Sequence, residues 1–256
     1  MSISIVTRAY RTSELKNLIS NLYTNLEVEK EIIAVCRIND YDIKGTNLII
    51  ENSNRFQARR TGIKSANYDK ILLLDSDQIP EKGILHELDD KNEDMVIIPE
   101  KSANKNFTSK CLDDWRYRNE KRAMKNPNPY IPVVPRYYKK AVLLNVIDNL
   151  LPDIYEIVDH EDSVLYYEIF KETRNIGFAK KYILNYDPPL NILMQKAFLY
   201  GKNSKTVENL EMPDDILVLI NKLNRSTLNI KELGVGRGYI TQIFRGLMYE
   251  LGRITK

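Results

Sequence analysis

The chain has 256 residues and a mass of 29.9 kDa, which is enough to bury a hydrophobic core in one large domain. Its 43% hydrophobic and 29% charged residues are ordinary for a soluble globular protein, and its two cysteines exclude a disulfide scaffold and suggest a reducing compartment. A formal net charge of +3 is too small to indicate nucleic-acid binding. Because no signal-peptide pattern and no apolar run of bilayer-spanning length is visible, we expect a cytoplasmic protein.

Strand-like and helix-like segments alternate over the first hundred residues. A stripe of leucines and isoleucines behind Thr12 or Ser13 predicts one helix, and residues 58–66 predict another. Short apolar runs predict strands at 2–6, 31–36, 47–50, 71–74 and 95–100. This βαβ rhythm indicates an α/β fold with a mainly parallel sheet flanked by helices.

The pattern changes after about residue 101. A charge-rich helix is expected around 111–125, and the proline-rich stretch 127–138 after it is expected to be an edge strand or a loop, because proline cannot donate to a sheet. A helix over 140–150, a helical HEDSVLYYEIFKE segment and a strand-like segment at 179–186 follow. From Leu190 onward the pattern is helical throughout.

The stretch KILLLDSDQIP joins a buried strand to two acids. Its four apolar residues run directly into Asp75, Ser76 and Asp77. Open α/β sheets bind ligands at the carboxyl ends of their strands, and neighbouring carboxylates repel each other and are costly to desolvate. The pattern therefore favours a site for a cation or a hydroxyl-rich ligand over an acidic turn closed by Pro80.

Several segments, in order, resemble the family 2 inverting glycosyltransferases, which have the GT-A fold. SIVTRAYR resembles the strand and turn that open the family, and ARRTGI resembles its Ala-Arg-Asn-x-Gly-Ile helix start. ILLLDSDQ is similar to the strand that carries the DxD motif, HEDSVLYYEIF to the segment with the catalytic base, and FLYGKNSK to a downstream Tyr-Gly-Lys segment. The likeness covers about residues 1–205.

This resemblance implies a GT-A-like, Rossmann-type glycosyltransferase domain over residues 1–205. Residues 1–100 would form its nucleotide-sugar-binding half and residues 101–205 its acceptor-binding half. Residues 206–256 would form a helical C-terminal extension.

On the donor side, the resemblance implies a nucleotide-diphospho sugar and a divalent cation, Mn²⁺ or Mg²⁺, that bridges two phosphate oxygens. Asp77 is the expected metal ligand, and Asp75 would hold ribose hydroxyls or a metal-bound water. Because CRINDYD stands where the family has an Asp-Asp-Gly-Ser turn, Asp40 is the candidate for the acid that meets the nucleobase. The remaining expected donor contacts are Thr7, Ala9, Tyr10, Arg59 and Ser76.

On the acceptor side, the resemblance implies that Asp162 takes the acceptor proton while the acceptor oxygen attacks the anomeric carbon. Glu161 would orient the acceptor or the metal. Asp162 also stands at the start of an apolar-striped helix, where it could serve as the N-cap. Trp115 and Arg118 are expected acceptor contacts, although the same residues would suit a solvated helix with one buried tryptophan.

The last segment, 238–256, predicts an amphipathic helix with arginines beside an apolar face. It suits a helix in a membrane interface, near a lipid-linked acceptor at the cytoplasmic face of the membrane. It equally suits packing on its own domain or dimerisation. The acceptor would be a glycan, a lipid-linked molecule or a protein, and not a nucleic acid. The apolar residues of the face are Ile240, Ile243, Phe244, Leu247, Met248 and Leu251.

Three other classes of protein would account for parts of this pattern. A haloacid-dehalogenase-like phosphohydrolase would use Asp75 as a covalent nucleophile, but its motif usually lies on the first strand. A nucleotidyltransferase would be expected to have a glycine-rich basic loop after the first strand, and TRAYRTSE has no glycine. A non-catalytic sugar-nucleotide-fold binding protein also remains open. The sugar, the nucleobase and the acceptor are not specified by any pattern in the chain.

Overall fold

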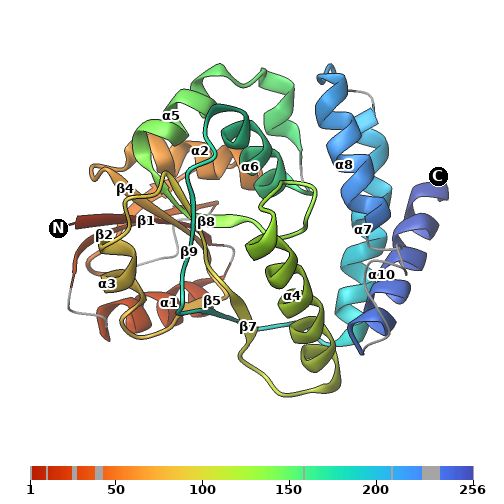
Figure 1. Cartoon of the computed structure of the whole chain (residues 1–256), viewed down its shortest axis with the longest axis horizontal. Helices are drawn as coiled ribbons and strands as arrows, with labels where there is room; N and C mark the ends of the chain where they lie inside the picture. Colours follow the sequence, from red (N-terminus) through yellow and green to blue (C-terminus); the bar gives the residue numbers. More distant parts are fainter. Residues whose placement is uncertain are drawn as a thin grey trace.

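The computed structural model describes residues 2–9, 11–24, 28–37, 43–157, 159–208, 210–226 and 237–255. Within these residues, seven strands form a central sheet in the order β3-β2-β1-β4-β8-β6-β9 (Figure 1). Neighbouring strands run parallel, except that β8 pairs antiparallel with both β4 and β6. The predicted α/β class with a mainly parallel sheet is confirmed. The strands are β1 (Ser2–Ala9), β2 (Glu29–Cys36), β3 (Asn47–Ile50), β4 (Lys70–Asp75), β6 (Met95–Ile97), β8 (Pro135–Lys139) and β9 (Ile176–Phe178).

Both faces of this sheet are covered, which explains the unbroken apolar run in β4. Ile71 and Leu73 point to one hydrophobic cluster, and Leu72 and Leu74 point to the other. Side chains alternate across a strand, so a strand buried on two faces needs an apolar residue at every position. The covering elements are α2 (Arg55–Ser65), α5 (Lys140–Asn149), the short 3₁₀ helix η1 (Pro152–Glu156) and α6 (Glu161–Glu172) on one face, and α1 (Thr12–Thr24) and α3 (Ile84–Asp89) on the other.

Helix α2 begins three residues before the predicted start at residue 58. Asn54 is its N-cap, and a reciprocal capping box joins Asn54 to Gln57, with a 3.0 Å bond from the Gln57 backbone N–H to the Asn54 side chain. The box satisfies two of the backbone donors that a helix start leaves free. It therefore fixes Arg55 as the first helical residue and brings Arg59 one turn later.

The predicted strand over 95–100 is confirmed at its start as β6, but it ends at Ile97, and Glu100 begins a strand of a different sheet. Pro99 has no N–H and separates β6 from β7 (Glu100–Ser102). Strand β7 joins a small sheet of order β5-β10-β7, formed with β5 (Gln78–Pro80) and β10 (Ile183–Asn185). The break turns the chain out of the central sheet directly before Glu100.

The proline-rich stretch is also corrected by the structure. Residues 127–134 form no helix or strand, which agrees with the loop alternative, but the last part is β8, an interior strand between β4 and β6. Pro135 is the first residue of the strand and pairs with Ile97 where the β6 register shifts, so its missing donor breaks no ladder inside the strand. Tyr137 and Tyr138 then bury their rings in the two opposite clusters.

The helices α4 (Phe107–Lys125), α7 (Leu190–Glu208), α8 (Asp214–Ser226) and α10 (Arg237–Ile254) stand together beside the sheet (Figure 1). Helices α7 and α10 run antiparallel in close contact: a Cβ on Gly201 would clash with the Tyr249 carbonyl oxygen, and one on Gly252 with the Phe198 carbonyl oxygen. The predicted boundary between residues 205 and 206 falls inside α7.

Helix α10 packs against α7 and α4 through the face opposite its apolar one. Its apolar row is exposed in the structure, and the row consists of Ile240, Phe244, Leu247, Leu251 and Ile254. None of the helices in the described residues combines the length and apolarity needed to cross a bilayer.

Candidate functional site

The carboxyl ends of β1, β2 and β4 open into one cavity, of about 490 Å³, which we call the sheet-edge cavity. In the parallel register Arg8 lies opposite Asp75, and Arg37 follows the end of β2 directly, so all three reach the same edge. Among the described residues, the cavity is lined by five cations, Arg8, Arg11, Arg37, Arg55 and Lys196, and three acids, Glu14, Asp75 and Asp77. Such a cation-rich wall suits phosphate groups.

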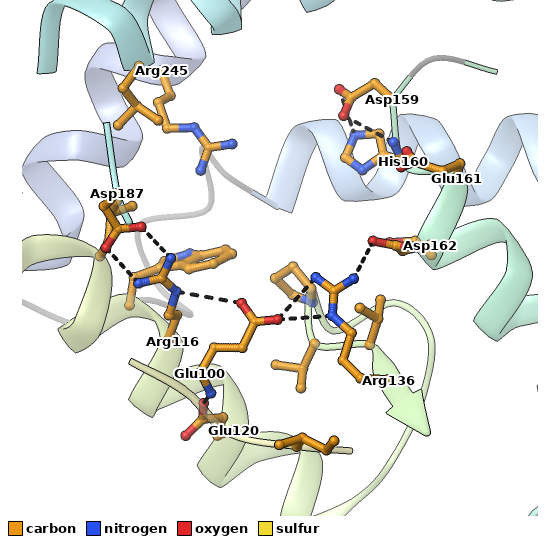
Figure 2. Close-up of a pocket in the computed structure, with 18 of the residues that line it drawn as sticks. Glu100, Arg116, Glu120, Arg136, Asp159, His160, Glu161, Asp162, Asp187 and Arg245 are labelled. Atoms are coloured by element: carbon orange, nitrogen blue, oxygen red, sulfur yellow. Dashed lines mark hydrogen bonds and ion pairs between the residues drawn. The ribbon is translucent and has the colours of Figure 1, made fainter. Parts of the chain in front are cut away.

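A second cavity, of about 340 Å³, lies between the sheet and the helices, and we call it the Trp115 cavity (Figure 2). Apolar side chains, including Trp115, Val134 and Leu193, form part of its wall. Its described acids are Glu100, Glu120, Asp159, Glu161, Asp162 and Asp187, and its described cations are Arg55, Arg116, Arg136 and Arg245.

Arg55 lines both cavities, so they meet at the start of α2. Its guanidinium lies 3.1 Å from Glu161, and the charge of Glu161 raises the pKa of Arg55 despite partial burial. One helical turn later, Arg59 is buried and lies 2.9 Å from Asp75, 3.4 Å from Glu161 and in contact with Asp162. Burial lowers the pKa of Arg59 from its usual value.

Arg136 makes a second bridge between the same acids. From β8 it lies 3.1 Å from Asp162 and 3.1 Å from Glu100 (Figure 2). It also lies 3.8 Å from Asp75. Burial alone would raise the pKa of Asp75, but Arg59 and Arg136 hold it well below its usual range. Asp75 and Asp162 are therefore each paired with the same two arginines, Arg59 and Arg136.

Asp77 differs from Asp75 in having no such partner. Within the described part of the chain it makes no ion pair, and burial with the charges of Asp75 and Glu14 raises its pKa to about 6. An uncompensated carboxylate beside two others fits a hard divalent cation. No three His, Cys, Asp or Glu residues of the described chain gather closely enough to form a metal cage, so Asp77 could be one ligand among substrate and water oxygens.

The other expected donor residues are distributed unevenly around this edge. Ser76 lines the sheet-edge cavity and donates to Glu14 at 3.3 Å. Thr7 and Ala9 are buried within β1 and do not line that cavity. Tyr10 and Asp40 lie outside the described residues, so their donor contacts stay predictions.

The two expected acceptor contacts also differ. Trp115 lines the Trp115 cavity, whereas Arg118 pairs with Asp114 at 3.3 Å on the outer side of α4 and lines neither cavity. Arg116, between them in sequence, also lines the Trp115 cavity and pairs with Asp187 at 2.6 Å.

The alternative that Asp162 is a helix N-cap is wrong. The N-cap is His160, which has a left-handed backbone (φ 65°), and α6 begins at Glu161. A non-glycine residue in this conformation costs about 1–3 kcal/mol, which the surrounding contacts must hold in place. His160 is tied to Asn224 of α8 by a 2.7 Å side-chain contact. The turn places both acids in the first turn of α6, where the helix dipole favours negative charge.

Sequence reasoning missed Glu100, Arg116, Arg136 and Arg245. Arg136 had a readable signal, because it is a lone charge inside the apolar run VVPRYY, and a buried charge needs a partner. Glu100 and Arg116 carried no comparable signal, because a charge at a strand end or on a charged helix is usually solvated.

Comparisons with known proteins bear on the fold. No protein-family model and no curated protein matches the sequence. Among solved structures, S. aureus TarS 1–349 in complex with UDP-GlcNAc aligns with a TM-score of 0.57 at 18% identity, covering 90% of this chain and 74% of that chain. The same TarS fragment without a named ligand aligns with a TM-score of 0.56, and with UDP it aligns at 0.54, each at 18% identity and over 90% of this chain.

The fold is GT-A-like. These matches cover 73% and 75% of the two TarS chains. At this identity the likeness establishes the GT-A-like fold and nothing finer. The predicted GT-A-like architecture is thereby confirmed, with its sheet-edge cavity at the carboxyl ends of the parallel strands.

Proposed function

We propose that this chain is a glycosyltransferase that moves a sugar from a nucleotide-diphospho sugar to an acceptor hydroxyl or a lipid phosphate, with inversion at the anomeric carbon. The observation that carries the proposal is that Arg59 contacts both Asp75 in the sheet-edge cavity and Asp162 in the Trp115 cavity. The guanidinium of Arg59 thus lies between Asp75, the acid proposed to contact the donor, and Asp162, the proposed general base. The GT-A-like fold shared with TarS, which has been solved with UDP-GlcNAc, supports the same reaction class.

The donor diphosphate would occupy the sheet-edge cavity. Arg8, Arg55 and Lys196 would neutralise its phosphate oxygens, and Asp75 would accept hydrogen bonds from the ribose hydroxyls or a metal-bound water. Asp77 would hold a divalent cation, Mn²⁺ or Mg²⁺. When bound, such a cation stabilises the charge that develops on the leaving diphosphate.

The acceptor would enter through the Trp115 cavity. Its hydroxyl would donate to Asp162, which takes the proton as the acceptor oxygen attacks the anomeric carbon and the bond to the diphosphate breaks. Because attack and departure occur on opposite faces, one base suffices and the configuration inverts. Glu161 is 2% exposed and is held by Arg55 and Arg59, so we assign it the task of orienting these arginines.

The exposed apolar row of α10 supports a role at a surface. We keep two finer proposals for it, a peripheral contact with the cytoplasmic face of a membrane and dimerisation through α10, since either would cover apolar side chains that are open to water. A lipid-linked acceptor would agree with the membrane contact, and a glycan or protein acceptor would agree with membrane contact or dimerisation.

The other classes have less support. As a phosphohydrolase nucleophile, Asp75 would have to leave its ion pairs with Arg59 and Arg136 to attack a phosphorus atom. A non-catalytic binding protein would have no use for the paired Asp162. The absence of a nucleotide-induced shift in the experiment below would favour these two classes over a glycosyltransferase.

Thermal unfolding with UDP, GDP, dTDP and CMP, each with and without Mn²⁺, tests the donor site. We expect one nucleotide to raise the unfolding midpoint of the wild type, with a larger rise when Mn²⁺ is present. Asp77→Asn should lose the Mn²⁺-dependent part of the rise, and Asp90→Asn, which removes an exposed acid that lines neither cavity, should retain it. No shift with any nucleotide at millimolar concentration would refute the proposed donor site.

A further inference from the structure

Arg245 is a cation of α10 that points into the Trp115 cavity (Figure 2). The sequence pattern of the C-terminal helix predicted arginines beside its apolar face. Instead, the α7–α10 contact at Gly201 and Gly252 turns Arg245 inward, opposite the apolar row. Among the described residues of α10, it alone lines this cavity.

The other described cations of the cavity have acidic partners. Arg55 pairs with Glu161, Arg136 with Asp162, and Arg116 with Asp187. In contrast, Arg245 forms no ion pair within the described chain, and its nearest hydrogen bond is a long contact of 3.5 Å to Gln242, one turn earlier on the same helix. A guanidinium has five donors in a planar fork, so most of its hydrogen-bonding capacity faces the cavity.

The electrostatic surroundings of Arg245 leave its charge incompletely compensated. Burial lowers the pKa of Arg245, Asp159 and Tyr200 act in the opposite direction without restoring the usual value, and the charge of Arg116 makes a smaller lowering contribution. Two guanidinium groups from α4 and α10 therefore approach the same cavity from different sides. An anion placed against both would replace the lost water and relieve their repulsion.

We propose that Arg245 binds an anionic group, a phosphate or a carboxylate, carried by the acceptor of the proposed transfer reaction. This inference rests on the proposed function only in taking the Trp115 cavity as the acceptor site. Arg245 and Asp162 lie on opposite sides of the cavity in Figure 2, so a bound anion stays away from the base while a hydroxyl on the same molecule reaches it. Trp115 and Leu193 offer an apolar wall for the body of the acceptor.

Trp115 makes the proposal directly measurable, because it is the only tryptophan of the chain and does not line the sheet-edge cavity. Tryptophan fluorescence would be titrated with glucose, glucuronate and glucose 6-phosphate, which share one ring and differ in the group at its C6 end. We expect at least one of the two anions to change the fluorescence and glucose to have no effect. Which anion acts distinguishes a carboxylate from a phosphate acceptor.

The matched variants are Arg245→Gln and Arg253→Gln, which remove one cation each from the same helix. Arg253 is half-exposed and pairs with Glu250 outside the cavity. The apparent affinity for the active anion should fall about ten- to a hundredfold in Arg245→Gln, as expected for a lost charged hydrogen bond, and stay unchanged in Arg253→Gln. Arg245→Lys should retain part of the apparent affinity that Arg245→Gln loses.

Equal responses to glucose and the anions, no response at all, or an undiminished response in Arg245→Gln would overturn the proposal. Because Arg245 forms no ion pair within the described residues, Arg245→Gln should unfold at the same or a higher temperature than the wild type. If Arg245→Gln and Arg245→Lys both had a lower unfolding midpoint than the wild type, Arg245 would have a structural role instead. No donor nucleotide is needed, so failure here and failure of the nucleotide experiment can be told apart.

Discussion

Arg59 donates a hydrogen bond of 2.9 Å to Asp75 from within the hydrophobic layer between α2 and the sheet. The same guanidinium contacts Asp162, so one buried cation compensates acids from two different elements, β4 and α6. Charges buried in this way are stable only as a set, because each is costly to desolvate alone.

Arg59→Gln should therefore destabilise the fold strongly. It leaves Asp75, Glu161 and Asp162 with less compensation, and removing one partner of a buried pair typically costs about 3–5 kcal/mol. Urea unfolding monitored by circular dichroism would measure the change. Arg60→Gln, at the exposed neighbouring position, should alter the unfolding free energy by less than about 1 kcal/mol. Equal effects of the two variants would contradict the buried network.

Asp77 should make stability depend on pH in a particular direction. Its folded pKa of about 6 exceeds the ordinary value of 3.8, so the folded state binds a proton more tightly than the unfolded state does. The stability linked to Asp77 is present below the unfolded pKa and is lost as pH rises through the folded pKa. At neutral pH, Asp77→Asn should thus be more stable than the wild type, by at most about 3 kcal/mol.

This gain should shrink towards zero as the pH falls below the unfolded value. Urea titrations from neutral pH to below 3.8, without divalent cations, would measure the unfolding free energy of the wild type and of Asp77→Asn at each pH. A gain that does not change with pH would mean that Asp77 is not the titrating group.

Asp162→Asn should separate catalysis from donor binding. Losing a general base typically lowers the rate by about 10²–10⁴, whereas the nucleotide-induced thermal shift should persist because Asp162 does not line the sheet-edge cavity. A transfer assay with the donor and acceptor identified by binding would measure the rate, and thermal unfolding with the nucleotide would measure the shift. If the variant kept full activity, the base assignment would have to be withdrawn.

Gly201→Ala should disturb the position of α10. Its new methyl group would meet the Tyr249 carbonyl oxygen, and overpacking of this kind costs about 1–3 kcal/mol. The same shift should weaken anion binding at Arg245. Asn203→Ala, on an exposed position of α7, should leave both properties nearly unchanged. Thermal unfolding and the Trp115 titration would test the pair, and equal behaviour of the two variants would argue against the close α7–α10 contact.

Local patterns predicted the parts of the site that follow from one strand or one helix. The apolar run before Asp75 identified a strand buried on both faces, and the acids after it fell at the carboxyl end of the sheet as expected. The predictions failed where proline position mattered. Proline rules predicted an edge strand or a loop over 127–138, but Pro135 starts an interior strand and brings Arg136 between Asp75 and Asp162.

The sequence alone determined the α/β class, the strand that delivers Asp75 and Asp77, and the presence of the helix that carries Arg59, because periodicity acts over a few residues. Only the tertiary structure decided which charges meet. Arg59 and Asp162 are more than a hundred residues apart, as are Trp115 and Arg245, and their approach depends on how strands order in a sheet and how helices pack. Such distant pairings cannot be predicted from a short stretch of sequence. Once the chain has folded, however, a buried charge requires an oppositely charged or hydrogen-bonding partner.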